Sequence, residues 1–85
     1  MPYSLEYTTS AWKEFKALEP AIQKRIAEKV VALADNPLPA GVRKLQGLDN
    51  HFRIRVGDYR VIYRVEAKRV VVVIVRIRHR REIYR

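Results

Sequence analysis

Arginine dominates the last 35 residues of this 85-residue chain, and its side chain is suited to binding phosphate. Ten of the twelve arginines lie at positions 51–85. That segment carries eleven basic and three acidic residues, whereas positions 1–50 carry seven and six. A guanidinium keeps its charge at ordinary pH, and its planar fork of donors matches a phosphate group. The pattern favours a polyanionic partner, nucleic acid first, over an acidic protein or an anionic membrane surface.

The other reactive residue types restrict the chemistry that the chain could perform. The chain has no cysteine and two histidines, which leaves no metal-ligand spacing, and it has no glycine-rich phosphate loop. Three acidic residues in the basic half are too few for a two-metal nuclease. Cleavage of RNA without a metal or cofactor stays open, because the 2′-OH is an internal nucleophile. Such a site needs a base, cations for the developing phosphate charge, and an acid for the leaving 5′-oxygen.

The basic half of the chain contains candidates for these tasks. His79 and Tyr84 could move a proton, although His79 could equally be a surface residue and Tyr84 a platform for base stacking. The cations that could stabilise a phosphate are Arg53, Arg55, Arg60 and Arg80. Secondary-structure elements must bring these side chains together.

Positions 1–36 predict a strand and two helices. Apolar alternation at 2–7 predicts a short strand, and Ser10 is the expected N-cap of a helix that ends near Leu18. Pro20 fits the first turn of a second helix, which Asn36-Pro37 ends. The two helices therefore form a hairpin. The residues expected to face the core are Trp12, Phe15 and Leu18 in the first helix, and Ile22, Ile26, Val30 and Leu33 in the second.

The rest of the chain predicts three antiparallel strands. Residues 37–50 contain two prolines and two glycines and are expected to form a crossing loop with room for one helical turn. Alternation predicts strands at 51–56 and 59–66, joined by the two-residue turn Gly57-Asp58. A turn at Ala67-Lys68 leads into a third strand at 69–77, which is apolar on both faces and is expected at the centre of the sheet.

These elements predict an α+β fold in a single domain spanning residues 1–85. The expected order is an N-terminal strand, an αα-hairpin and a three-stranded antiparallel meander (β-α-α-β-β-β), with both helices on one sheet face. The longest apolar run, Val70 to Val75, is too short to cross a bilayer, so no contact with a membrane core is expected.

The hairpin register places the basic side chains on one face of the sheet. A two-residue turn pairs Val56 with Tyr59 and Arg55 with Arg60, and cross-strand partners share a face. Stacked like charges favour a bound anion, unless the side chains extend into water or pair with Glu66 or Asp58. The basic residues of this face are His51, Arg53, Arg55, Arg60 and Arg64.

The last strand adds two uncertainties to this face. Val71, Val73 and Val75 make its middle apolar, which suits a protein-binding groove as well as a nucleic-acid cleft. A β-bulge near Arg76 would decide which later side chains point into the cleft. These side chains are Arg76, Arg78, His79, Arg80 and Arg81.

Four phrases in this order resemble the RelE branch of the RelE/ParE toxin superfamily. They are VRKLQG at 42–47, FRIR at 52–55, DYRVIY at 58–63 and HRREIY at 79–84, and with the order of elements they cover nearly the whole chain. The resemblance implies a toxin of a type II toxin–antitoxin pair, which enters the ribosomal A site and cuts mRNA there by the 2′-OH route without a metal. It also implies a cognate antitoxin, contacts with 16S ribosomal RNA and a location in a prokaryotic cytoplasm.

The resemblance implies roles for individual residues. Arg53 and Arg55 stand where RelE-like enzymes typically carry two lysines. Arg60 stands at the arginine that stabilises the phosphate transition state, Arg80 at the arginine linked to the leaving group, and Tyr84 at the tyrosine that stacks on or orients the substrate. The further residues expected to bind RNA or the ribosome are Arg43, Lys44, His51, Arg64, Arg78 and Arg81.

One departure from the family pattern leaves the general base open. The second lysine of the family has been considered the base, a role that Arg55 cannot readily fill. Either His79 or Tyr84 takes the proton, or arginine promotes the attack mainly by electrostatics. Two other functions also stay open: a ParE-like toxin that poisons DNA gyrase without nuclease activity, and a binding module without chemistry. The set of Arg60, Arg80 and Tyr84 favours the nuclease, because ParE-like chains generally lack it.

Overall fold

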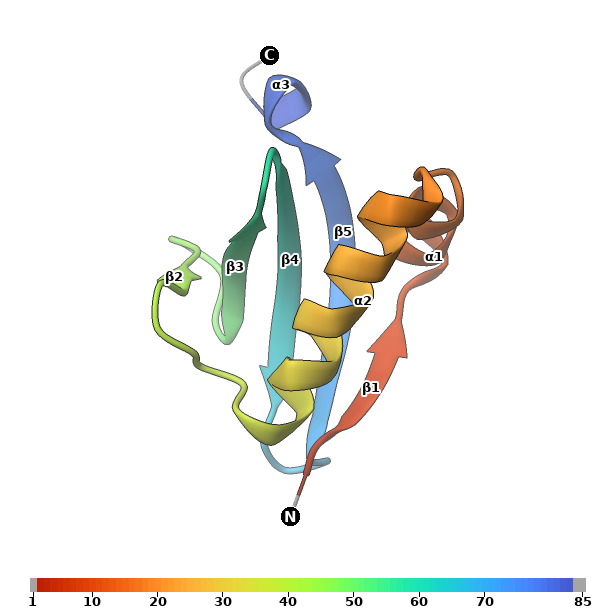
Figure 1. The fold of residues 1–85 in the computed structure, drawn as a ribbon. Coiled ribbons are helices and arrows are strands. Elements are labelled where there is room, and N and C mark those ends of the chain that lie inside the picture. The colour runs from red at the N-terminus through yellow and green to blue at the C-terminus, as the bar shows by residue number, and fades with distance from the viewer. Residues whose placement is uncertain (1, 84–85) are drawn as a thin grey trace.

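One five-stranded sheet organises the molecule. The computed structural model describes residues 2–83, and its strands lie in the order β1-β5-β4-β3-β2. β1 (Ser4–Tyr7) runs parallel to β5 (Val71–His79), although the two are far apart in the sequence (Figure 1). β4 (Tyr59–Glu66), β3 (His51–Val56) and β2 (Arg43–Lys44) continue the sheet as antiparallel neighbours. The predicted α+β class is confirmed.

Both long helices pack on one face of this sheet, as predicted. α1 (Thr9–Lys16) lies against β5 and β1, and α2 (Pro20–Asp35) crosses β1, β5 and β3 (Figure 1). The predicted apolar stripe of α2 is confirmed. Its residues Ile26, Val30 and Leu33 are buried, and Ile22 is partly buried against them. Each such side chain removed from water stabilises the fold by about 1.5–3 kcal/mol. The opposite sheet face is left to the basic residues.

The start of α1 corrects the sequence prediction. Thr8, not Ser10, is the N-cap: its backbone is extended, and its Oγ1 accepts the Ala11 N–H at 3.1 Å. The Thr8 hydroxyl also donates to the Val75 carbonyl at 2.9 Å, which ties the helix start to β5. Trp12, expected in the core, is 46% exposed and stacks on Phe15 instead. Ala11 takes the buried position beside it.

The ends of α2 follow the prediction. Pro20 occupies the first turn, and Asn36 ends the helix. The chain that follows is held to the sheet by the buried Tyr63, whose hydroxyl donates to the Pro37 carbonyl at 2.6 Å. Burial raises the pKa of Tyr63 to about 12. Within residues 2–83, no helix combines the length and apolar character needed to cross a membrane.

The strands of the basic half agree with the prediction in the middle and differ at both ends. The bounds and register of β3 and β4 are as predicted, from Val56 opposite Tyr59 to His51 opposite Arg64. The crossing loop at 37–50 contains the short strand β2, not the helical turn for which the sequence leaves room. β5 begins at Val71 rather than Arg69, because the 67–70 turn places Val70 at a φ of 56°. β5, which was expected at the centre of the sheet, lies between β1 and β4. The middle strand of the five is β4, because β2 extends the sheet beyond β3.

Candidate functional site

A β-bulge in β5 determines which C-terminal arginines join the basic sheet face. Tyr63 pairs with Ile74 and Ile62 with Arg76, so Val75 is the extra residue. After the bulge, Arg78 lies opposite Arg60, and the helix-facing positions become Ile77 and His79. β2 extends the other side of this face, where Arg43 pairs with Arg53. We call this surface the arginine face; its members are Arg43, Arg53, Arg55, Arg60, Arg76 and Arg78.

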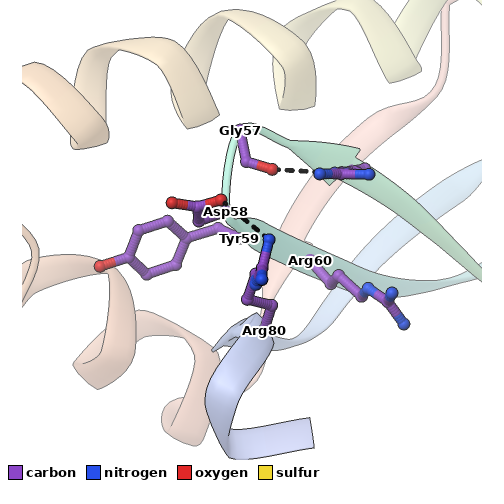
Figure 2. Close-up of a pocket in the computed structure, with 6 residues that line it drawn as sticks. Gly57, Asp58, Tyr59, Arg60 and Arg80 are labelled. Atoms are coloured by element: carbon purple, nitrogen blue, oxygen red, sulfur yellow. Dashed lines mark hydrogen bonds and ion pairs between the residues drawn. The ribbon is translucent and has the colours of Figure 1, made fainter.

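A pocket at one end of the arginine face gathers three of the predicted catalytic arginines. The turn pocket has a volume of about 220 Å³ and is drawn in Figure 2. The Gly57-Asp58 turn organises it: Arg55 Nε donates to the Gly57 carbonyl at 3.0 Å, and the Arg80 N–H donates to the Asp58 carbonyl at 2.8 Å. The Arg80 guanidinium also lies 3.7 Å from the Asp58 carboxylate. The lining residues are Arg55, Gly57, Asp58, Tyr59, Arg60 and Arg80.

A second basic pocket adjoins the first across Arg55 and Arg60. The edge pocket has a volume of about 380 Å³ and lies toward β2. Among residues 2–81, no carboxylate lies within ion-pair distance of Arg43, Arg53 or Arg55. Arg43, Arg53 and Arg55 can therefore offer their donors to a bound anion. The lining residues are Gly41, Arg43, Arg53, Ile54, Arg55 and Arg60.

The far end of the same sheet face is neutralised by ion pairs. Glu66 binds Arg64 at 2.7 Å and Arg69 at 2.8 Å, and Arg69 reaches Glu6 at 3.4 Å. The hydrogen bonds from Arg64 and Arg69 lower the pKa of Glu66 below its usual value. Val73, which lies between Glu6 and Arg64 in register, is only 3% exposed. Val71 and Val73 of the apolar middle expected from the sequence are thus buried, and Val75 is half-buried. Arg64 is paired with the carboxylate of Glu66.

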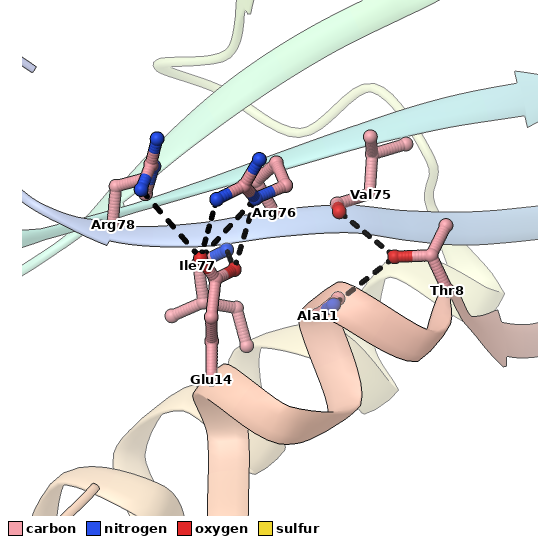
Figure 3. A network of polar contacts seen from close by, with 7 residues as sticks. All are labelled: Thr8, Ala11, Glu14, Val75, Arg76, Ile77 and Arg78. Atoms are coloured by element: carbon pink, nitrogen blue, oxygen red, sulfur yellow. Dashed lines mark hydrogen bonds and ion pairs between the residues drawn. The ribbon is translucent and has the colours of Figure 1, made fainter. Parts of the chain in front are cut away.

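Glu14 of α1 holds two arginines at the edge of β5 beyond the end of β1. Its carboxylate accepts from Arg76 Nη2 and from the Ile77 N–H, both at 2.8 Å, and lies 3.7 Å from Arg78 (Figure 3). Burial alone would raise the pKa of Glu14, but the hydrogen bonds from Arg76 and Ile77 and the charge of Arg78 lower it overall. No pattern in the sequence indicates that an acid of the first helix anchors this strand.

The structure brings only some of the other predicted residues near the pockets. His79 lies on the helix side of β5, edge-on to Tyr59 with ring centroids 5.1 Å apart, and its Nδ1 accepts the Arg81 N–H. Arg80 and Arg81 begin the short α3 (Arg80–Ile83). Tyr84 lies outside the described residues.

The last two predicted residues lie away from the turn pocket. His51 pairs with Arg64 at the far end of the face, where its Nδ1 lies 2.8 Å from the Asp49 carbonyl. Lys44 pairs with Phe52 and therefore points to the other side of the sheet from Arg43. Across the described chain, no three His, Asp or Glu side chains are grouped as ligands for a metal ion.

Sequence reasoning missed two cations that lie beside the hairpin turn. A β-carbon built on Gly57 would lie 3.2 Å from Arg25 Nη2, so the guanidinium of Arg25 packs directly against this glycine. Arg25 and Lys29 line a further pocket with Arg55. Their i, i+4 spacing places both on one side of α2, a signal that is present in the sequence.

Comparison with known proteins defines the class to which this fold and arginine-rich site belong. Residues 5–84 match the family model described as the ParE toxin of the type II toxin–antitoxin system parDE. The chain therefore belongs to the RelE/ParE family of type II toxins.

Named relatives of similar length are toxins of the RelE type. The chain is 36% identical to Toxin RelG of Mycobacterium tuberculosis, over all of this chain and 99% of the relative. It is 28% identical to the mRNA interferase toxin RelE of Escherichia coli, over 99% and 92%.

The solved structures agree with this relationship. The archaeal RelE–RelB complex from Pyrococcus horikoshii matches with a TM-score of 0.83 and 33% identity, over 94% of this chain and 97% of that one. The RelBE2 toxin–antitoxin complex from M. tuberculosis matches with a TM-score of 0.82 and 32% identity, over 93% and 99%.

Proposed function

We propose that this toxin is a ribosome-dependent endoribonuclease that cuts mRNA in the A site by attack of the 2′-OH on the adjacent phosphate. The observation that carries the proposal is that Arg55, Arg60 and Arg80 line the same pocket, the turn pocket. Fixed cations at the position of a developing phosphorane stabilise the transition state, and removal of one such donor typically costs about 10²–10³ in rate. The mRNA interferase name of the E. coli relative supports the same activity.

The reaction can be written with the groups of this site. The 2′-oxygen bonds to phosphorus as the bond to the 5′-oxygen breaks, which leaves a cyclic phosphate and a 5′-hydroxyl. In this proposal Arg60 and Arg53 bind the non-bridging oxygens, and Arg80 stabilises the charge on the leaving oxygen. His79 or Tyr84 transfers the proton, and Arg55 promotes the attack by its charge.

The identity of the base can be tested with two variants. His79→Ala and Tyr84→Phe each remove one titratable candidate without removing an arginine. The variant that removes the base should slow single-turnover cleavage by about 10²-fold or more and flatten its dependence on pH. Normal rates and an unchanged pH profile in both variants would leave arginine electrostatics as the source of the rate.

The partner of the toxin in this proposal is a cognate antitoxin. The relatives from P. horikoshii and M. tuberculosis were both solved as complexes of a toxin with its antitoxin. The second candidate function is a ParE-like gyrase poison, which the description of the matching family model favours.

Induced expression in bacteria separates these two functions. The nuclease should stop protein synthesis rapidly, whereas a gyrase poison should induce the SOS response while translation continues. Arg60→Ala and Arg80→Ala should abolish growth arrest. Arg69→Ala is a matched control, because Arg69 also borders the sheet but binds Glu66 and Glu6. Full toxicity of Arg60→Ala would contradict the assignment of the turn pocket.

A further inference from the structure

The hairpin turn is bordered by basic pockets on two sides, and only one of them belongs to the proposed catalytic site. The helix pocket, on the α2 side, has a volume of about 400 Å³. It is lined by Arg25, Glu28, Lys29, Arg55, Val56 and Gly57. The helix pocket and the turn pocket share Arg55 and Gly57.

We propose that the helix pocket binds a backbone phosphate of the same RNA strand whose scissile phosphate occupies the turn pocket. This inference rests on the proposed function, since it extends the RNA path from the catalytic arginines across the hairpin turn onto α2. Arg25 and Lys29 are the new phosphate-binding residues. Arg55 lies between the two sites and contributes to both.

The chemistry of the pocket favours a phosphate. Three cations, Arg25, Lys29 and Arg55, face one carboxylate, Glu28, which leaves an excess of positive charge. Within residues 2–81, neither Arg25 nor Lys29 has a carboxylate at ion-pair distance. A guanidinium and an ammonium side by side offer a planar fork and a point charge, the two donor types that proteins use for phosphate.

Gly57 fixes the position of this site relative to the catalytic one. Its φ is +60°, and the absence of a side chain lets Arg25 Nη1 and Nη2 approach to 3.3 and 3.2 Å from the place of a β-carbon. The carbonyl of the same residue accepts from Arg55. One glycine thus holds an arginine of α2 and an arginine of β3 next to the turn that positions Arg80.

Binding of uncleavable RNA tests this inference directly. A fluorescent single-stranded oligonucleotide, 2′-O-methylated at every position, is titrated with the protein at several salt concentrations. Lys29→Ala and Arg25→Ala should each weaken binding about 3–10-fold at low salt and reduce the slope of log affinity against log salt by about 0.7. Lys24→Ala is the matched control, because Lys24 lies on the same helix and lines none of these pockets. It should bind within about twofold of the wild type.

The outcomes separate this inference from the proposed function. Unchanged affinity and slope in Lys29→Ala, or equal losses in Lys29→Ala and Lys24→Ala, would overturn it. It would also be overturned if wild-type protein bound no RNA, or if Lys29→Ala weakened only antitoxin binding. Cleavage of mRNA by wild type and Arg60→Ala is measured in parallel with ribosomes. If Lys29→Ala and Lys24→Ala bind RNA equally well while wild-type protein cleaves mRNA, only the helix pocket is refuted. If Lys29→Ala alone weakens RNA binding but wild-type protein cleaves no mRNA, only the nuclease is refuted.

Discussion

Arg60 borders both the turn pocket and the edge pocket, and it pairs in register with an arginine on each side, Arg55 on β3 and Arg78 on β5. Like charges side by side in a sheet repel one another, and Glu14, 3.7 Å from Arg78, offsets part of this repulsion. A phosphate bound in the turn pocket would offset more of it. The proposed transition state supplies that anion. The Arg60 guanidinium can contribute both its charge and its planar fork of donors to binding that anion.

Arg60→Lys and Arg60→Ala separate these two contributions. The lysine keeps one positive charge but loses the planar fork, so we expect cleavage to fall about 10–100-fold. The alanine loses both, and we expect a fall of about 10³-fold. Single-turnover cleavage of mRNA on programmed ribosomes measures both rates. Equal rates for wild type and Arg60→Lys would show that charge alone is sufficient.

Tyr63 gives a prediction about stability rather than activity. Its raised pKa, about 12 in the folded protein, exceeds the ordinary value of 10.0. Between pH 10 and pH 12 the folded state keeps the phenol proton of Tyr63, whereas the unfolded state loses it. The contribution of protonated Tyr63 to the free energy of unfolding is therefore complete below pH 10 and is lost as the pH rises toward 12. Urea denaturation should show that Tyr63→Phe flattens this alkaline loss. The variant should also cost about 1 kcal/mol at pH 7, because the Pro37 carbonyl loses its donor.

A second tyrosine provides the control for this measurement. Tyr3→Phe also removes one phenol, from a ring at the margin of the core. It should keep the alkaline loss of the wild type. The same pH dependence in Tyr63→Phe and wild type would contradict the role given to Tyr63.

At the scale of the element, α1 completes the edge of β5 that β1 leaves open. β1 pairs with β5 only as far as Ile74. Beyond that point Thr8 binds the Val75 carbonyl, and Glu14 accepts the Ile77 N–H. The Thr8 contact is at the bulged residue Val75, and the Glu14 contact lies two residues after it, so both are close to the register shift that places Arg76 and Arg78 on the arginine face. The position of the site thus depends on a helix that contributes no residue to the three basic pockets.

Glu14→Gln tests this anchoring role. The variant should lower the free energy of unfolding at pH 7 by about 1.5–3 kcal/mol, because the bonds from Arg76 and Ile77 lose their charged acceptor. The folded pKa of Glu14 is lowered, so its contribution is present above the ordinary value of 4.5 and is lost as the pH falls through the folded pKa. The wild type should therefore lose more stability on acidification than the variant. Glu19→Gln, which changes an exposed carboxylate, should behave as wild type.

The elements also show what the sequence could and could not predict. The β3–β4 register was predictable, because side chains alternate with a period of two and Gly57-Asp58 fixes the pairing. The position of the bulge at Val75 could not be predicted in this way. The contacts from Thr8 and Glu14 to this edge of β5 come from residues more than 60 positions earlier in the chain. The placement of Arg25 against Gly57 depends on the crossing of α2 over the sheet, which no local pattern specifies.

In the whole molecule, which carries a formal net charge of +9, the charged side chains of the basic sheet face are distributed unevenly. Acidic side chains neutralise the end near Glu66, whereas the end at the hairpin turn gathers cations from β2, β3, β4, α2 and the start of α3. An anionic strand is attracted to one end of the molecule in preference to the other.

Antitoxin binding should stabilise the toxin through linkage. A partner that binds only the folded state, at about 100 times its Kd, adds about 2.7 kcal/mol to the free energy of unfolding. For a domain of this size each kcal/mol raises Tm by roughly 4–8 °C. Thermal unfolding of the toxin with and without its cognate antitoxin measures the shift. An unchanged Tm at saturating antitoxin would contradict a partner specific for the folded toxin.

The most direct test of the central claim is to map the 5′ ends of mRNA in a translation reaction that receives the purified protein. The account predicts new 5′-hydroxyl ends inside codons positioned in the ribosomal A site, present with wild type and Arg69→Ala and absent with Arg60→Ala. The same RNA without ribosomes should stay intact. Intact mRNA in the presence of wild-type toxin and translating ribosomes, or equal cleavage by wild type and Arg60→Ala, would contradict the account.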